Sequence, residues 1–253
     1  MNKNLAFFAV LLLTSTPAAY AAERDCDPRA LLAAGQSEEA SLWALLDQPI
    51  VNGAQIIRHL QRHPEFAGLY AADAGVWEKY SIEQHTLMVF DTFAEQFGAY
   101  RDFYKFDLGS DIRLLQTLKF VIALHDIGKP HAIKAGDKNR QHEFTVPILK
   151  EAMKRYGFSR EERKLGEALV GNDVLGDLVK GNISAGAAKE RLVKSAERAG
   201  LEVKVYVPVQ LMFYTIDAAS YPTLRQRIFT IDDGLLVPNR GQFRQLWQEM
   251  AKP

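Results

Sequence analysis

The chain has few of the features that place a protein in a class at once. Only one of its 253 residues is a cysteine, Cys26, so no disulfide can form within the chain. Its 31 Lys and Arg are balanced by 31 Asp and Glu, which leaves no net charge to attract a polyanion. We find no low-complexity segment and no internal repeat. These absences argue against a disulfide-stabilised scaffold, a repeat protein and a dedicated nucleic-acid-binding protein, so no strong nucleic-acid binding is expected.

Long apolar runs are also scarce, and the clearest one lies at the N-terminus. Lys3 precedes an apolar run from Leu5 to Leu13, and residues 19–21 (Ala-Tyr-Ala) have the small side chains that a signal peptidase reads. This pattern predicts a signal peptide at residues 1–21, cleaved after Ala21, and an exported protein that is periplasmic or secreted. The run is short for crossing a bilayer, so no stable membrane anchor is expected; an uncleaved N-terminal anchor is the alternative.

The rest of the chain, roughly 230 residues, is long enough for one helical domain and too short for two. Helical spacing of apolar residues predicts a mainly α fold, a helical bundle with a small β-hairpin near the C-terminus. Residues 22–79 are interpreted as a helical extension packed on the core, and residues 80–253 as the main domain. Helices are predicted at 28–34, 38–46, 53–62, 83–97, 146–155, 160–170, 185–199 and 242–250.

Two segments have strand patterns. Residues 202–207 alternate polar residues with valine, which predicts a strand, and Pro208 after them is expected to start a helix. Residues 229–237 predict a hairpin that turns at Asp233 and Gly234 and could pair with the first segment.

The most informative stretch is an apolar segment that ends in the adjacent pair His125 and Asp126. His125 continues the helical spacing of Leu118 and Val121, which predicts that its imidazole faces the core. Gly128 follows as a residue free to turn left-handed and end the helix. A buried imidazole beside a buried carboxylate costs several kcal/mol without a partner. A divalent cation would satisfy both groups.

Further candidate ligands lie before and after this pair. His85 shares a helix face with Val89, and Asp217 shares one with Phe213, so both are expected to point inward. His142 is a third candidate. The predicted metal ligands are therefore His85, His125, Asp126, His142 and Asp217. Mixed histidine and carboxylate ligands suit Mn, Fe, Co, Ni or Zn, with Mg also open.

The order of these residues, His85, then His125-Asp126, then Asp217, resembles the HD-domain superfamily of metal-dependent phosphohydrolases. Gly128-Lys129 directly after the pair adds to the resemblance. Residues 80–86 (Tyr-Ser-Ile-Glu-Gln-His-Thr) look most like the HD domains that accompany bacterial nucleotidyltransferases. The resemblance covers roughly residues 80–220, and no nucleotidyltransferase signature precedes it.

The resemblance implies an HD-like bundle that hydrolyses phosphomonoesters or phosphodiesters, often of nucleotides. A metal-activated water would attack phosphorus. Asp126 would be both ligand and orienting group, and Lys129 would offset charge on the phosphate or the leaving oxygen, so these two are the predicted catalytic residues. The implied partner is a small phosphorylated substrate, with the oligomeric state open.

Members of the superfamily with two metals use a histidine in the region of His142 and another further on. Here Asn172-Asp173 stands where the further histidine is expected, which favours one tightly bound metal and leaves a weaker second site as the alternative. Two alternatives remain open at this point. One is a catalytically silent protein that binds a ligand or partner, and the other is a di-iron oxygenase, which needs a complete second site.

Two other features have competing interpretations. His59 and His63 are four residues apart, as ligand pairs often are, but no acidic residue accompanies them; we expect surface or hydrogen-bonded histidines. The aromatic residues Tyr70, Trp77 and Tyr80 are expected to pack in the core, with a substrate wall of Trp77 or Tyr80 beside His85 as the alternative.

Overall fold

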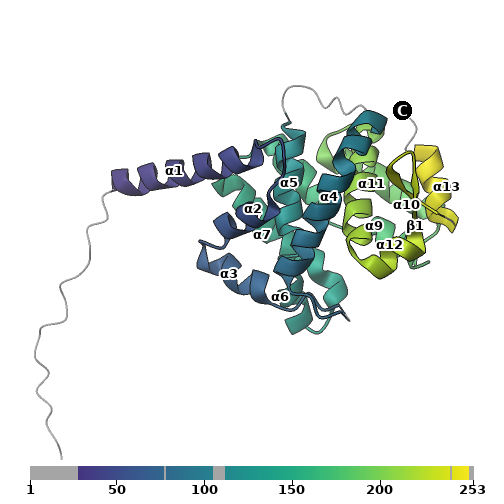
Figure 1. Cartoon of the computed structure of the whole chain (residues 1–253), viewed down its shortest axis with the longest axis horizontal. Coiled ribbons are helices and arrows are strands. Elements are labelled where there is room, and N and C mark those ends of the chain that lie inside the picture. The colour runs from purple at the N-terminus through teal and green to yellow at the C-terminus, as the bar shows by residue number, and fades with distance from the viewer. Residues whose placement is uncertain (1–27, 77, 105–111, 240, 251–253) are drawn as a thin grey trace, which may run out of the picture. The chain divides into compact units, whose positions relative to one another are not determined.

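The computed structural model of the chain describes residues 28–76, 78–104, 112–239 and 241–250, with backbone alone for 28–36 and 99–104 (Figure 1). The predicted signal peptide, Cys26 and Trp77 lie outside these residues. The chain divides into two units, residues 1–37 and 38–253. Apart from the first part of helix α1, the elements described below belong to the second unit. Among the described residues, no helix combines the length and apolar character needed to cross a membrane.

The fold is mainly α with a two-stranded antiparallel hairpin, as predicted. The helices in chain order are α1 (Pro28–Leu46), α2 (Gly53–Leu60), α3 (Pro64–Ala71), α4 (Ile82–Tyr104), α5 (Leu114–Leu124), α6 (Lys129–Lys134), the 3₁₀ turn η1 (Lys138–Arg140), α7 (Gln141–Arg155), α8 (Arg160–Val170), α9 (Val174–Val179), α10 (Ala185–Ala199), α11 (Val203–Ser220), α12 (Pro222–Ile228) and α13 (Gly241–Met250). The strands are β1 (Phe229–Asp232) and β2 (Leu235–Pro238).

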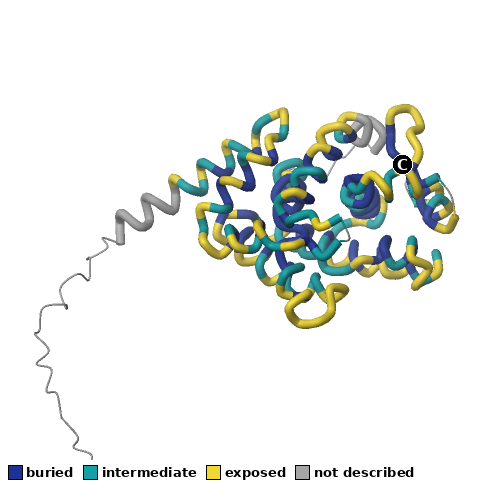
Figure 2. The backbone as a smooth tube through the Cα atoms, turned by 60° about the horizontal axis from the view of Figure 1, so that its bottom comes forward, coloured by how far each residue is buried: buried dark blue, intermediate teal, exposed yellow. Residues whose placement is uncertain are grey.

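Helices α4, α5 and α11 form the centre of the unit. In α5 every residue from Thr117 to Leu124 is buried, because the segment is apolar except for Thr117 and Lys119 and is covered by α4, α7 and α8. Lys119 is satisfied there by hydrogen bonds to the backbone carbonyls of Leu46 and Gln48. Helices α4 and α11 lie side by side in Figure 1 and pack along their lengths. Figure 2 shows buried residues on the inward turns of the helices and exposed residues on the outward turns. The core therefore surrounds the helix that ends at His125.

The predicted extension shares this core. The α2 helix approaches α4 so closely that a Cβ on Gly53 would lie 2.4 Å from the ring of Phe90. Tyr70 of α3, fully buried as predicted, donates a hydrogen bond of 2.7 Å to the carbonyl of Ala123 in α5. Residues 53–76 thus fix the position of the α5 C-terminus.

The predicted strand at residues 202–207 is wrong. Val203 begins α11, and Pro208 lies inside that helix instead of starting it. The alternating valines also fit a helix, because Val203 and Val207 are four residues apart. Burial of the neighbouring Tyr206 and Val209 outweighs the one backbone hydrogen bond that the proline removes.

The hairpin is confirmed, but its predicted partner is not, since residues 202–207 are helical. Strands β1 and β2 pair with each other in the register Thr230 opposite Val237, with the turn at Asp233 and Gly234. The backbone amide of Leu236 donates to the side-chain Oε1 of Gln96 on α4 at 2.8 Å, which holds the hairpin against the bundle.

Several helix boundaries also differ from the prediction, and α4 runs to Tyr104, beyond the predicted end at residue 97. The segments 28–34 and 38–46 form one helix, because an internal Gly35 costs about 1 kcal/mol and does not by itself end a helix. Helix α7 begins at Gln141, five residues before the predicted start, and continues through Pro147. His142 therefore lies in the first turn of a helix.

A buried carboxylate joins the beginnings of α5 and α8. Glu162 is fully buried and accepts four hydrogen bonds of 2.7–3.0 Å, three from Arg113 and one from the Ser159 amide. The Arg113 guanidinium in turn lies 3.6 Å above the ring of Trp43. Ser159 and Glu162 form a reciprocal capping box, and Arg113 is the N-cap of α5. This network fixes the end of α5 that is remote from His125.

We predict that Glu162→Gln lowers the free energy of unfolding by about 2 kcal/mol, because it leaves buried donors without a charged acceptor. Glu65→Gln, which breaks the exposed pair with Arg155, is the control and should cost less than about 0.5 kcal/mol. Denaturant unfolding measures both. Equal losses in the two variants would contradict this role of Glu162.

The difference in free energy of unfolding between wild type and Glu162→Gln should also depend on pH. Burial acts to raise the pKa of Glu162, but hydrogen bonds from Arg113 and Ser159 outweigh it and hold the pKa below the ordinary value of 4.5. The stabilisation is therefore fully present above about pH 4.5 and is lost as the pH falls through the lowered pKa. Wild type and Glu162→Gln should converge in acid.

Candidate metal centre

Four predicted ligands meet at the junction of α4, α5 and α11. The Nε2 atoms of His85 and His125 are 3.2 Å apart. Oδ2 of Asp126 lies 3.4 Å from His85 Nε2 and 3.7 Å from His125 Nε2. Oδ1 of Asp217 lies 3.0 Å and 3.4 Å from the same two nitrogens. His85, His125 and Asp126 are buried, whereas the side chain of Asp217 is 33% exposed.

These separations fit a bound cation. With metal–ligand bonds of about 2.1 Å, neighbouring ligand atoms lie about 3.0 Å apart in an octahedral site and about 3.4 Å apart in a tetrahedral one. His85, His125 and Asp126 form a buried group whose ligand atoms all lie within 4.8 Å of one another. This group could hold a metal ion. Asp217 lies within hydrogen-bond distance of both imidazoles, on the more exposed side of the group.

Local structure orients the His85 ring. The hydroxyl of Ser81 accepts from the Gln84 amide at 3.1 Å, and the side-chain oxygen of Gln84 accepts from the Ser81 amide at 2.9 Å. This reciprocal cap fixes the first turn of α4, in which His85 lies. The ring of Tyr221 stacks on the His85 imidazole, with ring centroids 4.5 Å apart and planes 19° from parallel.

His125 is oriented by the end of its own helix. Its Nδ1 lies 2.8 Å from the carbonyl oxygen of Ile122. A carbonyl only accepts, so Nδ1 carries the proton and Nε2 is directed at the cluster as a potential ligand. Phe213 of α11 packs edge-on against the ring at 6.1 Å. His85 differs, because its buried Nδ1 has no partner among the described residues.

The charges of the cluster are strongly coupled. Burial acts to lower the pKa of His125, but the carboxylates of Asp126 and Asp217 outweigh it and raise the pKa to about 9. Burial acts to raise the pKa of Asp217, but hydrogen bonds from both imidazoles outweigh it and hold the pKa well below its usual range. The two carboxylates therefore favour positive charge between them, whether a proton or a cation supplies it.

Two further side chains hold Asp126. Lys129 Nζ lies 2.6 Å from Oδ2, and Gln141 Nε2 lies 3.2 Å from Oδ1. Burial acts to lower the pKa of Lys129, but the charge of Asp126 outweighs it, so the amine stays protonated. The prediction from sequence missed Gln141, although it adjoins the candidate His142.

Gly128 does not end a helix as predicted, because α5 ends at Leu124 and Gly128 is the N-cap of α6. Its φ is −84°, so it does not turn left-handed. A Cβ at this position would lie 2.3 Å from the amide nitrogen of Thr145, and the Gly128 amide donates to the Thr145 hydroxyl at 3.2 Å. The glycine is needed because α7 approaches closely, and that approach brings Gln141 to Asp126.

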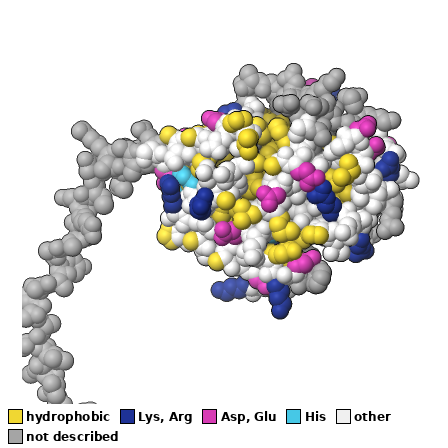
Figure 3. Space-filling view, viewed as in Figure 1, with side chains coloured by type: hydrophobic (Ala, Val, Ile, Leu, Met, Phe, Trp, Pro, Cys, Tyr) yellow, Lys and Arg dark blue, Asp and Glu magenta, His cyan; other side chains and the backbone are white. Residues whose placement is uncertain are grey.

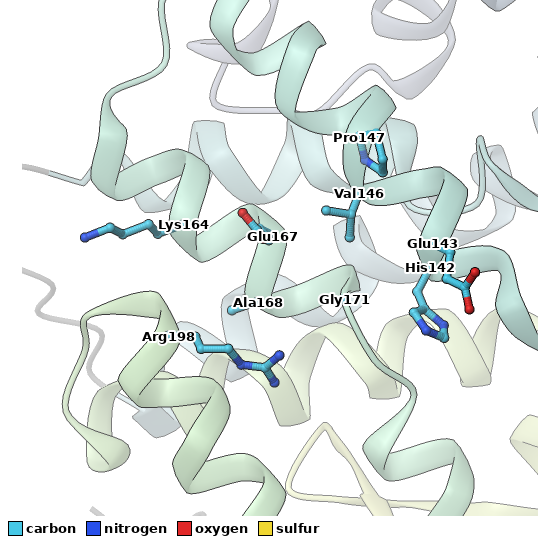
Figure 4. A pocket seen from close by; sticks show the side chains of 9 residues that line it. All are labelled: His142, Glu143, Val146, Pro147, Lys164, Glu167, Ala168, Gly171 and Arg198. Atoms are coloured by element: carbon cyan, nitrogen blue, oxygen red, sulfur yellow. The ribbon is translucent and has the colours of Figure 1, made fainter.

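The structure places His142 outside this buried group. His142 is half-buried and lines a cavity of about 410 Å³ between α7, α8 and α10 (Figure 4). Other residues of that cavity are Glu143, Val146, Lys164, Glu167 and Arg198. Figure 4 shows the His142 ring beside Glu143 at one side of the cavity, with Lys164 extending away at the other.

Asn172, which stands where a second-site histidine is expected, donates to the Ser195 hydroxyl on α10 at 3.3 Å. The aromatic wall of the site is Tyr221, which sequence reasoning missed; it directly follows α11, so its position depends on how that helix ends. Tyr80 lies 6.5 Å from Tyr221, ring to ring, and contributes to the same side of the site.

We predict that Co²⁺ stabilises the untagged protein, by about 2.7 kcal/mol at 100 times its dissociation constant. His85→Gln should lose the response, because it removes one of the two imidazole ligands. His142→Gln should retain it and is the matched control. Thermal unfolding with and without Co²⁺, together with the visible absorption of bound Co²⁺, measures the effect. A stabilisation that survives in His85→Gln would contradict the site.

Comparisons of the chain with protein-family models, with curated proteins and with solved structures find no significant match. No relative supplies a function, so the assignment depends on the residues of this chain.

Proposed function

We propose that the protein is a metal-dependent phosphohydrolase of the HD-domain type. Its substrate is a phosphomonoester or phosphodiester of a small molecule such as a nucleotide. The observation that supports this most directly is that the side chains of His85, His125, Asp126 and Asp217 converge. The two imidazole Nε2 atoms lie 3.2 Å from each other and 3.0–3.7 Å from the carboxylate oxygens. Lys129 next to this cluster adds the cation that a phosphate needs.

The donor set favours a transition metal. Two imidazoles and two carboxylates suit Mn, Fe, Co, Ni or Zn better than Mg, which prefers oxygen ligands and keeps several waters. A single tightly bound ion is proposed, because Asn172 is hydrogen-bonded to Ser195 and His142 lies outside the buried group.

A bound cation would supply a Lewis acid and an activated water for attack at phosphorus. The residues of the chain supply the rest. Asp126 is fixed through both oxygens by Lys129 and Gln141, so its carboxylate is already oriented in the folded protein. Nδ1 of His125 is held by a backbone carbonyl, which keeps Nε2 free to bind. Little rearrangement is then needed when the site is filled.

Exposure indicates how a substrate would enter. The side chains of His85, His125 and Asp126 are almost completely covered, whereas Asp217 is 33% and Lys129 14% exposed. A phosphate would therefore approach on the side of Asp217 and Lys129. There the amine can neutralise a phosphate or leaving oxygen.

Export is part of the same proposal. The pattern of residues 1–21, a single Lys3 followed by an apolar run and small residues at 19–21, supports a signal peptide. The substrate would then be a phosphorylated molecule outside the cytoplasm.

We predict that Asp126→Asn abolishes metal-dependent hydrolysis, because it removes a charged ligand. Release of nitrophenol from p-nitrophenyl phosphate and from bis(p-nitrophenyl) phosphate, with each metal in turn, measures the activity and separates monoesterase from diesterase. Hydrolysis by wild type that persists in the presence of a chelator, and equally in Asp126→Asn, would overturn the proposal.

Lys129→Met should lower kcat by about 100-fold and leave Co²⁺ binding in place, because the amine acts on charge and is not a ligand. Lys134→Met is the matched control, since Lys134 lies on the same helix α6 but is exposed and forms no ion pair with the described residues. Steady-state kinetics and Co²⁺ titration measure both. Equal activity of the two variants would remove Lys129 from the mechanism.

A further inference from the structure

His59 is a buried histidine outside the metal centre, and its ring has no hydrogen-bond partner in the described part of the chain. It is 2% exposed, and neither ring nitrogen contacts a polar group among the described residues. It is therefore neither a surface nor a hydrogen-bonded histidine, contrary to the prediction. His63 does have partners, since its Nε2 lies 2.9 Å from the Tyr156 hydroxyl and 2.9 Å from Glu38 Oε1. Buried polar groups without partners are rare, and each calls for an explanation such as a missing ligand.

His59 lies at the edge of a groove of about 610 Å³ between α1 and α2. The groove is lined by Ser41, Leu45, Gln55, Arg58, His59 and Arg62. Gln55, Arg58, His59 and Arg62 have the spacing i, i+3, i+4 and i+7, so they share one face along α2 and its C-terminal turn. No lining residue carries a negative charge. The groove therefore presents donors and cations on one side and small or apolar groups of α1 on the other.

Within the described part of the chain, the two arginines of the groove have no carboxylate partner. Arg58 and Arg62 are exposed and form no ion pair with the described residues. Some other exposed arginines pair with carboxylates, such as Arg140 with Glu143, Arg155 with Glu65 and Arg191 with Asp177. Arg160 and Arg227 are exposed and, like Arg58 and Arg62, form no ion pair with the described residues. Glu38, whose charge acts to raise the pKa of His59, is bound to His63. Figure 3 shows one face of the molecule, on which Lys and Arg side chains lie among Asp and Glu side chains.

Two guanidinium groups that flank a groove suit an oxyanion. Each presents planar pairs of N–H donors that match two oxygens of a phosphate. The environment also keeps the His59 ring neutral, because burial and the charge of Arg62 lower its pKa. A neutral imidazole has one N–H to donate, which complements an anion without adding a charge that must be desolvated.

We propose that this groove binds a phosphate group, held by Arg58 and Arg62, with the His59 ring turning to donate its N–H to a phosphate oxygen. The site shares no residue with the metal centre. It can therefore be occupied independently of any substrate there. Its ligand is inorganic phosphate or the phosphate of a small ester.

Histidine side-chain NMR tests the proposal directly. The chain has six histidines, and the His59 signal is assigned by its loss in His59→Gln. Titration of the metal-free protein with inorganic phosphate should shift the His59 ring signals in a saturable way, whereas sodium chloride of equal ionic strength should not. The signals of His85 and His125 report the metal centre in the same spectra, so binding there is read separately.

The double variant Arg58→Gln/Arg62→Gln should weaken phosphate binding by about tenfold or more, because two charge-assisted contacts are lost. Arg160→Gln/Arg227→Gln removes the same charge from exposed arginines elsewhere and should leave the affinity unchanged. Isothermal titration calorimetry gives a second measure of the affinity. Equal weakening in both double variants, or the same His59 shift with chloride, would overturn the proposal.

A titration with methylphosphonate identifies the kind of ligand. This ion resembles a phosphate ester but cannot be hydrolysed. Saturable His59 shifts with both anions assign the groove to phosphate esters, and shifts with inorganic phosphate alone assign it to the free ion. Shifts with neither would contradict the proposed site.

Discussion

The central constraint in this protein is that two imidazole nitrogens are buried 3.2 Å apart, between two carboxylates. In a medium of low polarity such a cluster is stable only if positive charge lies within it. The raised pKa of His125 expresses this demand when a proton supplies the charge. A divalent cation would meet the same demand with both imidazoles neutral, and the buried group of His85, His125 and Asp126 could hold it.

The surrounding fold serves to hold this cluster in place. The position of His85 depends on the capped first turn of α4. The position of His125 depends on helix α5, which Tyr70 holds at its C-terminal end and the buried Glu162 network holds at its N-terminal end. Asp126 depends on the close approach of α7, which only a glycine at position 128 permits. The site therefore combines elements that are far apart in the sequence, and its precision depends on the packing of α5 among them.

Helical spacing correctly predicted that His85 and His125 face the core, because inward-facing positions recur regularly on long amphipathic helices, whereas Asp217 is one-third exposed. It could not place Tyr221 or Gln141, whose contacts with His85 and Asp126 arise only when separate helices pack. The strand predicted at 202–207 failed because alternating valines over six residues fit either structure until burial decides. The role of His142 as a metal ligand stays a prediction. The groove beside His59 could not be predicted from the sequence, because its lining residues come from both α1 and α2 and depend on how these helices pack.

The most direct test of the account is the location of a bound metal by anomalous X-ray scattering from crystals grown with Mn²⁺ or Co²⁺. The account predicts one strong peak about 2.0–2.3 Å from Nε2 of His85, Nε2 of His125 and carboxylate oxygens of Asp126 and Asp217. Peaks found only elsewhere, or no peak within bonding distance of both imidazoles, would contradict it.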